Sequence, residues 1–311
     1  MMPEDSKPVK VTVLLSTYNG SIFLQQQLDS LYAQTYPHIR ILARDDGSSD
    51  STRTILESER SRGALDILEG YNNLGPALSF FELLKSAASI ETEYVAFCDQ
   101  DDVWHPHKIA HAVSALTGVA GSCPAMYCSR LEIVDEQLKH IGYTEMPGKV
   151  GFGNALVENV AVGCTMVLNR KAIDLIRENL PAKVLIHDWW CYLVLSCFGE
   201  IIFDSSADIK HRQHGSNTIG IATNMFDQLG RKLRRFFGSG GGHLWLSEQA
   251  SLFSSIFKER IPLLHRRVIN KFVAAKLSFK CRVQLVFSRE IWRQKWSDNL
   301  ILRLLLLINR I

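Results

Sequence analysis

Short apolar runs in the first hundred residues alternate with longer stretches of helical spacing. β-Branched and aliphatic runs predict strands over residues 9–15, 39–43, 65–68 and 94–98. Helical spacing predicts helices over residues 22–33, from the polar turn 45–49 through residue 62, and over 76–88. Strands that alternate with helices of ~10–15 residues form βαβ units with a parallel sheet. The pattern therefore predicts an α/β fold.

The rest of the chain is less regular. A strand is predicted over residues 160–168, a helix from 171, a helix over 189–198 and a strand over 200–203. The glycine-rich stretch 238–242 predicts a flexible linker, followed by basic helices over 285–296 and 299–311. We therefore expect two regions, residues 1–230 and 231–311.

Charge divides the chain at the same place. Residues 1–230 carry 18 Lys and Arg against 28 Asp and Glu, whereas residues 231–311 carry 17 against 4. Two interpretations of the basic region stay open: an interfacial anchor on an anionic membrane, or helices packed on the first region with solvated charges. Nucleic-acid binding is not expected, because no recognised module accompanies the charge. The basic clusters are 231–235, 266–267 and 289–295, interleaved with Trp245, Trp292 and Trp296.

Cysteine usage and hydropathy bear on the compartment. Seven cysteines are scattered without any C-x-x-C spacing, which favours neither a disulfide framework nor a zinc site. The first residues contain no apolar stretch of the signal-peptide kind, and no run of ~18 apolar residues occurs in the chain. We expect a cytoplasmic protein, peripheral on the inner face of the cell membrane.

Polar clusters follow three of the predicted strands, at 16–20, 45–50 and 99–102. Ligands of parallel sheets gather beyond the carboxyl ends of the strands, so these clusters predict one shared site. The acidic segment 99–102 suits Mg²⁺ or Mn²⁺ bridging a diphosphate, because both ions favour oxygen ligands. A solvated acidic turn that caps the next helix is the alternative.

The cluster at 44–52 contains a pair of acids, Asp45 and Asp46. Acids at a strand end can accept hydrogen bonds from a base N–H and from a ribose hydroxyl. The alternative is a plain turn in which Asp50 or Ser51 begins the next helix. The two interpretations are compatible.

Taken together, seven motifs resemble a known enzyme family in order and spacing. Four of them, spanning 13–20, 45–52, 73–75 and 99–102, are similar to those of family 2 glycosyltransferases. The other three resemble the bacterial rhamnosyltransferase subgroup: Gly163-Cys164-Thr165-Met166, His187-Asp188-Trp189-Trp190 and Arg212-Gln213-His214-Gly215-Ser216-Asn217. The resemblance covers about residues 9–220, and its specificity lies in the ordered set.

The resemblance implies a GT-A fold, an inverting mechanism and a nucleoside-diphosphate sugar donor. It places the nucleotide-sugar on Thr17, Tyr18, Asn19, Asp45, Asp46, Asp99, Gln100 and Arg212. Two frames of the metal motif fit, Asp99/Asp101 and Asp101/Asp102, so Asp101 is common to both. His214 is a further candidate ligand.

Asp188 matches the family's catalytic base, which removes the proton of the attacking acceptor hydroxyl. A helix N-cap is the competing role for this residue. The acceptor is expected near Trp189, Trp190, Cys164 and Thr165, with only one of the two tryptophans facing it.

The subgroup resemblance implies L-rhamnose from dTDP-L-rhamnose as the sugar, moved to a polysaccharide or lipid-linked glycan. A UDP-hexose donor is the nearest rival, and a non-catalytic nucleotide-binding assembly module is a rival of another class. Kinase and dehydrogenase interpretations are disfavoured, because the sequence shows neither a P-loop nor a G-x-G-x-x-G after the first strand.

Overall fold

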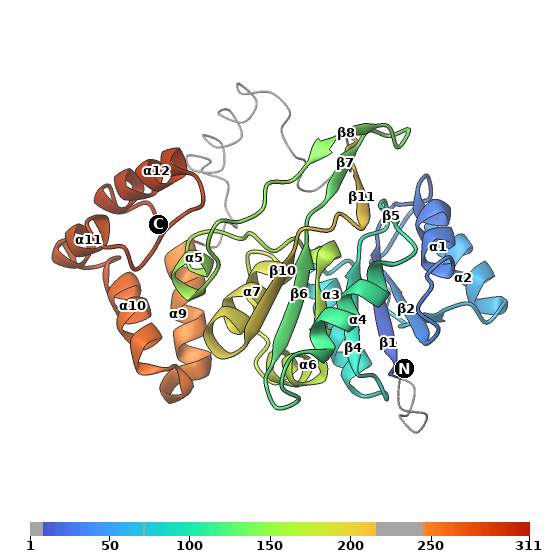
Figure 1. The fold of residues 1–311 in the computed structure, drawn as a ribbon, viewed down its shortest axis with the longest axis horizontal. Coiled ribbons are helices and arrows are strands. Elements are labelled where there is room, and N and C mark those ends of the chain that lie inside the picture. Colours follow the sequence, from blue (N-terminus) through green and yellow to red (C-terminus); the bar gives the residue numbers. More distant parts are fainter. Residues whose placement is uncertain (1–8, 71, 216–244) are drawn as a thin grey trace.

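A seven-stranded sheet forms the centre of the protein in the computed structural model, which describes residues 9–70, 72–215 and 245–311 (Figure 1). Its strand order is β10-β6-β9-β4-β1-β2-β3. Only β9 runs antiparallel to its neighbours, so the predicted parallel-rich α/β fold is confirmed. The strands are β1 (Val11–Thr17), β2 (Ile39–Asp45), β3 (Asp66–Ile67), β4 (Tyr94–Cys98), β6 (Ala125–Ser129), β9 (Val167–Asn169) and β10 (Glu200–Asp204).

Helices cover both faces of this sheet because successive strand residues point to opposite sides. Leu14 and Phe97 pack with α3 (Pro76–Ala88), α6 (Arg170–Arg177) and α7 (His187–Phe198). Val13 and Ala96 pack on the other face, with α1 (Leu24–Tyr32), α2 (Thr52–Ser61) and α4 (Lys108–Thr117). Both faces are thus buried, as in a three-layer α/β architecture.

A second, four-stranded sheet lies beside the carboxyl end of β4. Its order is β5 (Val103–Trp104), β11 (Ile209–Arg212), β7 (Glu132–Val134) and β8 (His140–Tyr143). β5 directly follows the acidic segment 99–102 and pairs with β11. This pairing brings residues around 211 next to an acidic segment that is more than a hundred residues earlier in the chain.

One predicted strand is partly wrong. Residues 160–168 were expected to be extended throughout, but η1 (Gly163–Thr165) interrupts them and only β9 joins the sheet. The physical reason is a hydrogen bond: the Gly163 amide donates to the Asp188 side chain instead of to a neighbouring strand. The short α5 (Phe152–Ala155) precedes this segment.

The C-terminal helices pack on the α/β unit. They are α9 (Leu246–Phe257), α10 (Leu263–Ala274), α11 (Phe279–Val286) and α12 (Trp296–Leu307), with η2 (Lys258–Arg260) between the first two. Trp190 of α7 contacts Phe253 and Phe257 of α9, with ring centroids 5.9 and 6.4 Å apart. The structure thus shows the C-terminal helices packed on the first region. Any contact with a membrane would involve the faces of these helices that stay exposed.

The expected helix over 285–296 is wrong. α11 ends at Val286 and α12 begins at Trp296. Arg303 explains the break, because its guanidinium donates to the carbonyls of Leu285, Ser288 and Ile291, which satisfies backbone acceptors without a helix. The expected linker 238–242, the cluster 231–235 and the expected boundary at 230 lie outside the described residues.

Among the helices in the described ranges, none combines the length and the hydropathy that crossing a bilayer requires.

Candidate functional site

The loops after β1, β2 and β4 meet at one edge of the large sheet. The Tyr18 amide donates to Gln100 Oε1 at 2.8 Å, and Gln100 Nε2 donates back to the Tyr18 carbonyl at 3.0 Å. A Cβ at Gly20 would lie 2.1 Å from Gln100 Oε1, so any other residue at this position would displace the Gln100 side chain. The predicted meeting of the polar clusters is confirmed, and Gln100 holds two of them together.

Asp45 joins the first two loops. Its Oδ1 accepts a hydrogen bond from Thr17 Oγ1 at 3.1 Å, and its Oδ2 accepts one from the Ser48 amide at 3.0 Å. Asn19, at φ 47°, donates its amide to Ser48 Oγ, while the Tyr18 side chain is 50% exposed. Tyr18 and Asn19 therefore face solvent at this edge, with Thr17 and Asp45 buried beneath them.

Asp46 points away from Asp45. It accepts hydrogen bonds from the amides of Leu74 and Gly75, both at 2.8 Å, and forms a buried ion pair with Arg44. Gly75 is the N-cap of α3, so Asp46 and Arg44 fix the entry to that helix. Both carboxylate oxygens of Asp46 are thus engaged by protein groups, whereas the resemblance implied contact with the nucleotide.

Replacing Asp46 with asparagine is expected to lower the free energy of unfolding by about 3–5 kcal/mol, because the buried Arg44 guanidinium loses its only carboxylate partner among the described residues. Chemical denaturation with urea measures this change. Asp66→Asn is the matched control: its ion pair with Arg40 has both side chains 52% exposed, and such pairs contribute about 0–1 kcal/mol. Equal losses for the two variants would contradict a structural role for Asp46.

The acidic segment contacts two histidines: His211 lies in β11 of the second sheet, and His214 lies just after that strand. Asp101 Oδ2 lies 2.8 Å from His214 Nε2, and Asp102 Oδ1 lies 2.9 Å from His211 Nδ1. Burial, and then the charge of Asp102, raise the pKa of Asp101. The pKa of Asp99 is raised well above its usual range by burial, followed by the charges of Asp102 and Asp101. The carboxylates thus repel one another in a poorly solvated place.

On electrostatic grounds, Asp99 and Asp101 are candidates to hold a divalent cation. Burial and mutual repulsion both oppose ionisation of Asp99 and Asp101, and a bound cation offsets both. Their oxygens, with the His214 imidazole, are suitable ligands for Mn²⁺, and the oxygens alone suit Mg²⁺. Asp102 is fully buried, and its second oxygen has no hydrogen-bond partner within the described part of the chain.

His211 was missed by the sequence interpretation. Burial alone would lower its pKa, but the charge and hydrogen bond of Asp102 raise that pKa to about 9. Asp102 and His211 also lie close to Cys164, and their ligand atoms lie within 4.8 Å of one another. The feature of the sequence that could have indicated His211 is its position three residues before His214, as a second histidine in the same motif region.

Arg212 is enclosed by protein. Its Nε donates to the Asp101 carbonyl at 2.9 Å, its Nη2 donates to Gln26 Oε1 at 2.7 Å, and its guanidinium lies 4.5 Å from the Phe23 ring. A third nitrogen donates to the Glu136 carbonyl. These contacts brace the acidic segment, so this conformation favours a positioning role for Arg212, and its predicted contact with the donor stays a prediction.

Asp188 lies in the first turn of α7, two residues after the N-cap Ile186. Its carboxylate accepts hydrogen bonds from the Gly163 amide at 3.0 Å and from the Trp189 amide at 2.6 Å. Burial raises its pKa to about 7 although these bonds oppose the shift. The charge of Asp188 also raises the pKa of Asp99. Because Ile186 is the N-cap of α7, the N-cap alternative for Asp188 is wrong.

The four residues expected near the acceptor differ in exposure. Trp190, Cys164 and Thr165 are buried, and Trp190 packs on α9. Trp189 is half-buried and donates its indole N–H to the Ala155 carbonyl at 2.7 Å. Of the two tryptophans, only Trp189 keeps surface that an acceptor could contact.

His187 lies beside the Asp188 position but inside the core. Its ring centroid is 4.1 Å from that of Phe80, and burial lowers its pKa to about 3. It is therefore neutral. A Cβ on Gly163 would lie 2.8 Å from His187 Nε2, so only glycine lets this backbone approach Asp188.

Comparison with known proteins gives both family and fold. The model for "Glycosyl transferase family 2" matches residues 12–175, more than half of the chain. The dTDP-rhamnosyl transferase RfbG of Shigella flexneri is 24% identical over 316 residues, covering 95% of this chain and 99% of that protein. A glycosyltransferase of Rickettsia typhi is 25% identical over 236 residues, covering 73% and 71%.

Two solved structures share the GT-A fold. Staphylococcus aureus TarS in complex with UDP-GlcNAc has a TM-score of 0.54 at 16% identity, covering 88% of this chain and 83% of that chain. The mannosyltransferase PcManGT of Pyrobaculum calidifontis, in complex with GDP-Man and Mn²⁺, has a TM-score of 0.52 at 17% identity, covering 91% and 75%. At these identities the likeness concerns the fold alone.

Proposed function

Because the chain belongs to glycosyltransferase family 2, we propose that it transfers L-rhamnose from dTDP-L-rhamnose to a hydroxyl group of a polysaccharide or lipid-linked glycan, with inversion at the anomeric carbon. The similarity to RfbG, which extends over nearly the full length of both chains, supports this donor. The product would belong to a cell-surface polysaccharide of the O-antigen or capsule type, made on the cytoplasmic side of the membrane.

One observation carries the proposal: the buried Asp188 carboxylate accepts a hydrogen bond from the Gly163 amide, and the next residue, Cys164, lies with its Sγ within 4.8 Å of the Asp102 carboxylate of the acidic segment. A general base is most effective when its pKa lies near the operating pH, and burial raises the pKa of Asp188 to about 7. The amides of Gly163 and Trp189 fix the orientation of its carboxylate. Asp188 then takes the proton of the acceptor hydroxyl as that oxygen attacks the sugar.

Asp99, Asp101 and His214 would hold the divalent metal ion, Mg²⁺ or Mn²⁺. When bound, the metal supplies Lewis-acid neutralisation of the charge that develops on the leaving diphosphate. Asp102 would act on the site through His211 and the Arg212 amide, which it holds in β11. The nucleotide would lie along the loop edge formed by Thr17, Tyr18, Asn19 and Asp45, with Gln100 fixing that edge.

A UDP-hexose donor is the second candidate. The UDP-Glc-dependent glucosyltransferase WfgD of Escherichia coli is 30% identical over 166 residues, which favours such a donor by local similarity. That match covers 53% of this chain, against 95% for RfbG. We therefore rank dTDP-L-rhamnose first.

A donor screen tests the proposal. The full chain is incubated with Mn²⁺ and with dTDP-L-rhamnose, UDP-glucose, UDP-GlcNAc or GDP-mannose, and its thermal transition and the released nucleotide are measured. We expect metal-dependent stabilisation and nucleotide release with dTDP-L-rhamnose above all others. A preference for UDP-glucose would replace the first candidate by the second, and no response to any donor would instead favour a non-catalytic module.

A further inference from the structure

α12 is apolar on both of its faces. Leu302, Leu305 and Leu306 are buried against the rest of the protein. Trp296, Leu300 and Leu304 follow one another at intervals of four residues, so they form a stripe along the other face. Their exposed fractions are 81%, 55% and 53%, and Leu307 and Ile308 extend the stripe. A surface helix normally turns polar side chains outward, so this exposed apolar stripe indicates a binding surface.

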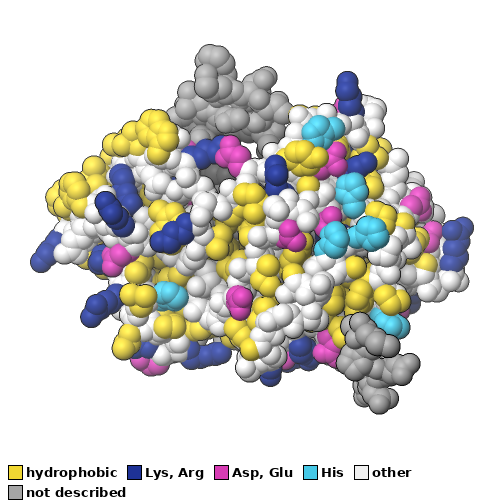
Figure 2. Space-filling view, in the orientation of Figure 1, with side chains coloured by type: hydrophobic (Ala, Val, Ile, Leu, Met, Phe, Trp, Pro, Cys, Tyr) yellow, Lys and Arg dark blue, Asp and Glu magenta, His cyan; other side chains and the backbone are white. Residues whose placement is uncertain are grey.

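The exposed apolar surface continues onto α11. Phe279 at the start of that helix and Phe287 just after its end are both largely exposed, the latter 84%. Arg303 ties the two helices together by its hydrogen bond to the Leu285 carbonyl. Figure 2 shows hydrophobic side chains gathered over the region of α11 and α12, with Lys and Arg side chains beside them. This lipophilic surface, defined by Phe279, Phe287 and the α12 stripe, is well beyond the isolated exposed residues of an ordinary surface.

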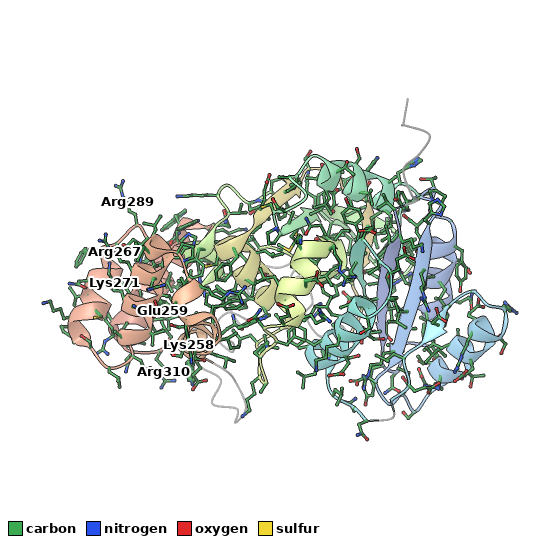
Figure 3. All side chains as sticks on the ribbon, turned by 90° about the horizontal axis from the view of Figure 1, so that it is seen from below. Lys258, Glu259, Arg267, Lys271, Arg289 and Arg310 are labelled. Atoms are coloured by element: carbon green, nitrogen blue, oxygen red, sulfur yellow. The ribbon has the colours of Figure 1, made fainter. Side chains whose placement is uncertain are left out.

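The helical unit that carries the lipophilic surface is strongly basic. Residues 245–311 contain 13 Lys and Arg against 4 Asp and Glu. Two of these acids are already paired, Glu259 with Arg266 and Glu290 with Lys271. Exposed basic side chains remain at Lys280, Arg289 and Arg310, and Figure 3 shows Arg267, Arg289 and Arg310 on this helical unit.

The geometry points to an anionic lipid surface as the partner: the exposed faces of α11 and α12 enter the interface of the bilayer, with Trp296 at the headgroup level. Exposed aliphatic and aromatic side chains contribute apolar burial, tryptophan favours the interface, and basic neighbours are attracted by anionic headgroups. α12 has 12 residues, which suits a helix lying in the plane of the membrane.

A second copy of the chain fits this surface less well. It would bring the same excess of positive charge into contact with itself, and like charges at an interface are unfavourable. Of the three tryptophans in the basic region, only Trp296 is available to lipid. The Trp292 ring packs beneath Lys149, and Trp245 is half-buried near Lys276.

Vesicle sedimentation of the full chain tests this inference. We expect binding to vesicles made of equal parts phosphatidylcholine and phosphatidylglycerol, at least about tenfold weaker binding to phosphatidylcholine alone, and weakening by salt. The double variant Leu300→Glu/Leu304→Glu should lose at least about tenfold in vesicle affinity, because two charges are placed where the apolar stripe enters the interface. Brominated lipid should quench Trp296, and Trp296→Phe should remove that quenching.

Leu264→Glu is the matched control. Leu264 is as exposed as the α12 leucines but lies near the start of α10, at the other end of the helical unit from α12 (Figure 1). The Leu264→Glu variant should bind vesicles as strongly as the unaltered protein does. Circular dichroism establishes that this variant and the double variant both fold. Equal vesicle binding by the double variant and the control would overturn the inference. A second result would also overturn it: the unaltered protein does not bind vesicles but forms a dimer, and the double variant is a monomer. That result would assign the surface to a second copy of the chain.

Discussion

Replacing Asp188 with asparagine is expected to slow sugar transfer by about 10²–10⁴-fold while the affinity for the donor stays unchanged. Asparagine keeps the shape of the side chain but cannot take the proton of the acceptor hydroxyl. Steady-state transfer kinetics and calorimetric donor binding measure the two quantities separately. A large rise in the donor dissociation constant, with little effect on the rate at saturation, would contradict the role of a base.

The pH profile of the unaltered enzyme gives an independent check on Asp188. Its pKa is raised to about 7 by burial, and only the ionised form acts as a base. We therefore expect kcat/KM to rise with pH below about 7 and to level off above it. Asp29→Asn, which removes an exposed carboxylate on α1, is the control and should leave both the rate and the profile unchanged.

The second large effect is expected at Asp101. Asp101→Asn should weaken Mn²⁺ binding by at least about 100-fold, since even an outer-shell partner of a metal ligand contributes 10–100-fold. The variant should also lose the rise in thermal transition temperature that Mn²⁺ gives the unaltered protein. The physical reason is that the variant lacks one of the two carboxylates proposed to offset the metal charge, together with the carboxylate contact that His214 makes at 2.8 Å.

Glu132→Gln serves as the control for Asp101. Glu132 is a carboxylate on β7 that also contacts histidines, His105 and His140, but at a different place in the second sheet. We expect its Mn²⁺ response to equal that of the unaltered protein. If Asp101→Asn responds to Mn²⁺ as strongly as Glu132→Gln does, the acidic cluster is not the metal site.

The sequence predicts the strands and the meeting of their loops well, because both follow from periodicity and from parallel pairing. β4 and α3 have the expected bounds, and the loops after β1, β2 and β4 share one edge as expected. Asp188 could be singled out from its motif alone. Its burial, and the consequent pKa of about 7, required the packed structure.

The sequence did not reveal the direction in which side chains point at the end of a strand. Adjacent residues there point to opposite sides, so Asp45 turns to Thr17 whereas Asp46 turns to Arg44. His211 depends in the same way on β11 pairing with β5, a contact between segments far apart in the chain. The course of residues 287–295 depends on Arg303, whose role as a cap is not encoded in any local pattern.

The packing of α7 connects the proposed base to the C-terminal helices. The family model ends at residue 175, but Asp188 and His214 both lie beyond it. Two residues after Asp188, the Trp190 ring is wedged against Phe253 and Phe257 of α9. A truncated protein without α9 would have a cavity next to the first turn of α7, so we expect removal of this helix to disturb the position of Asp188 as well.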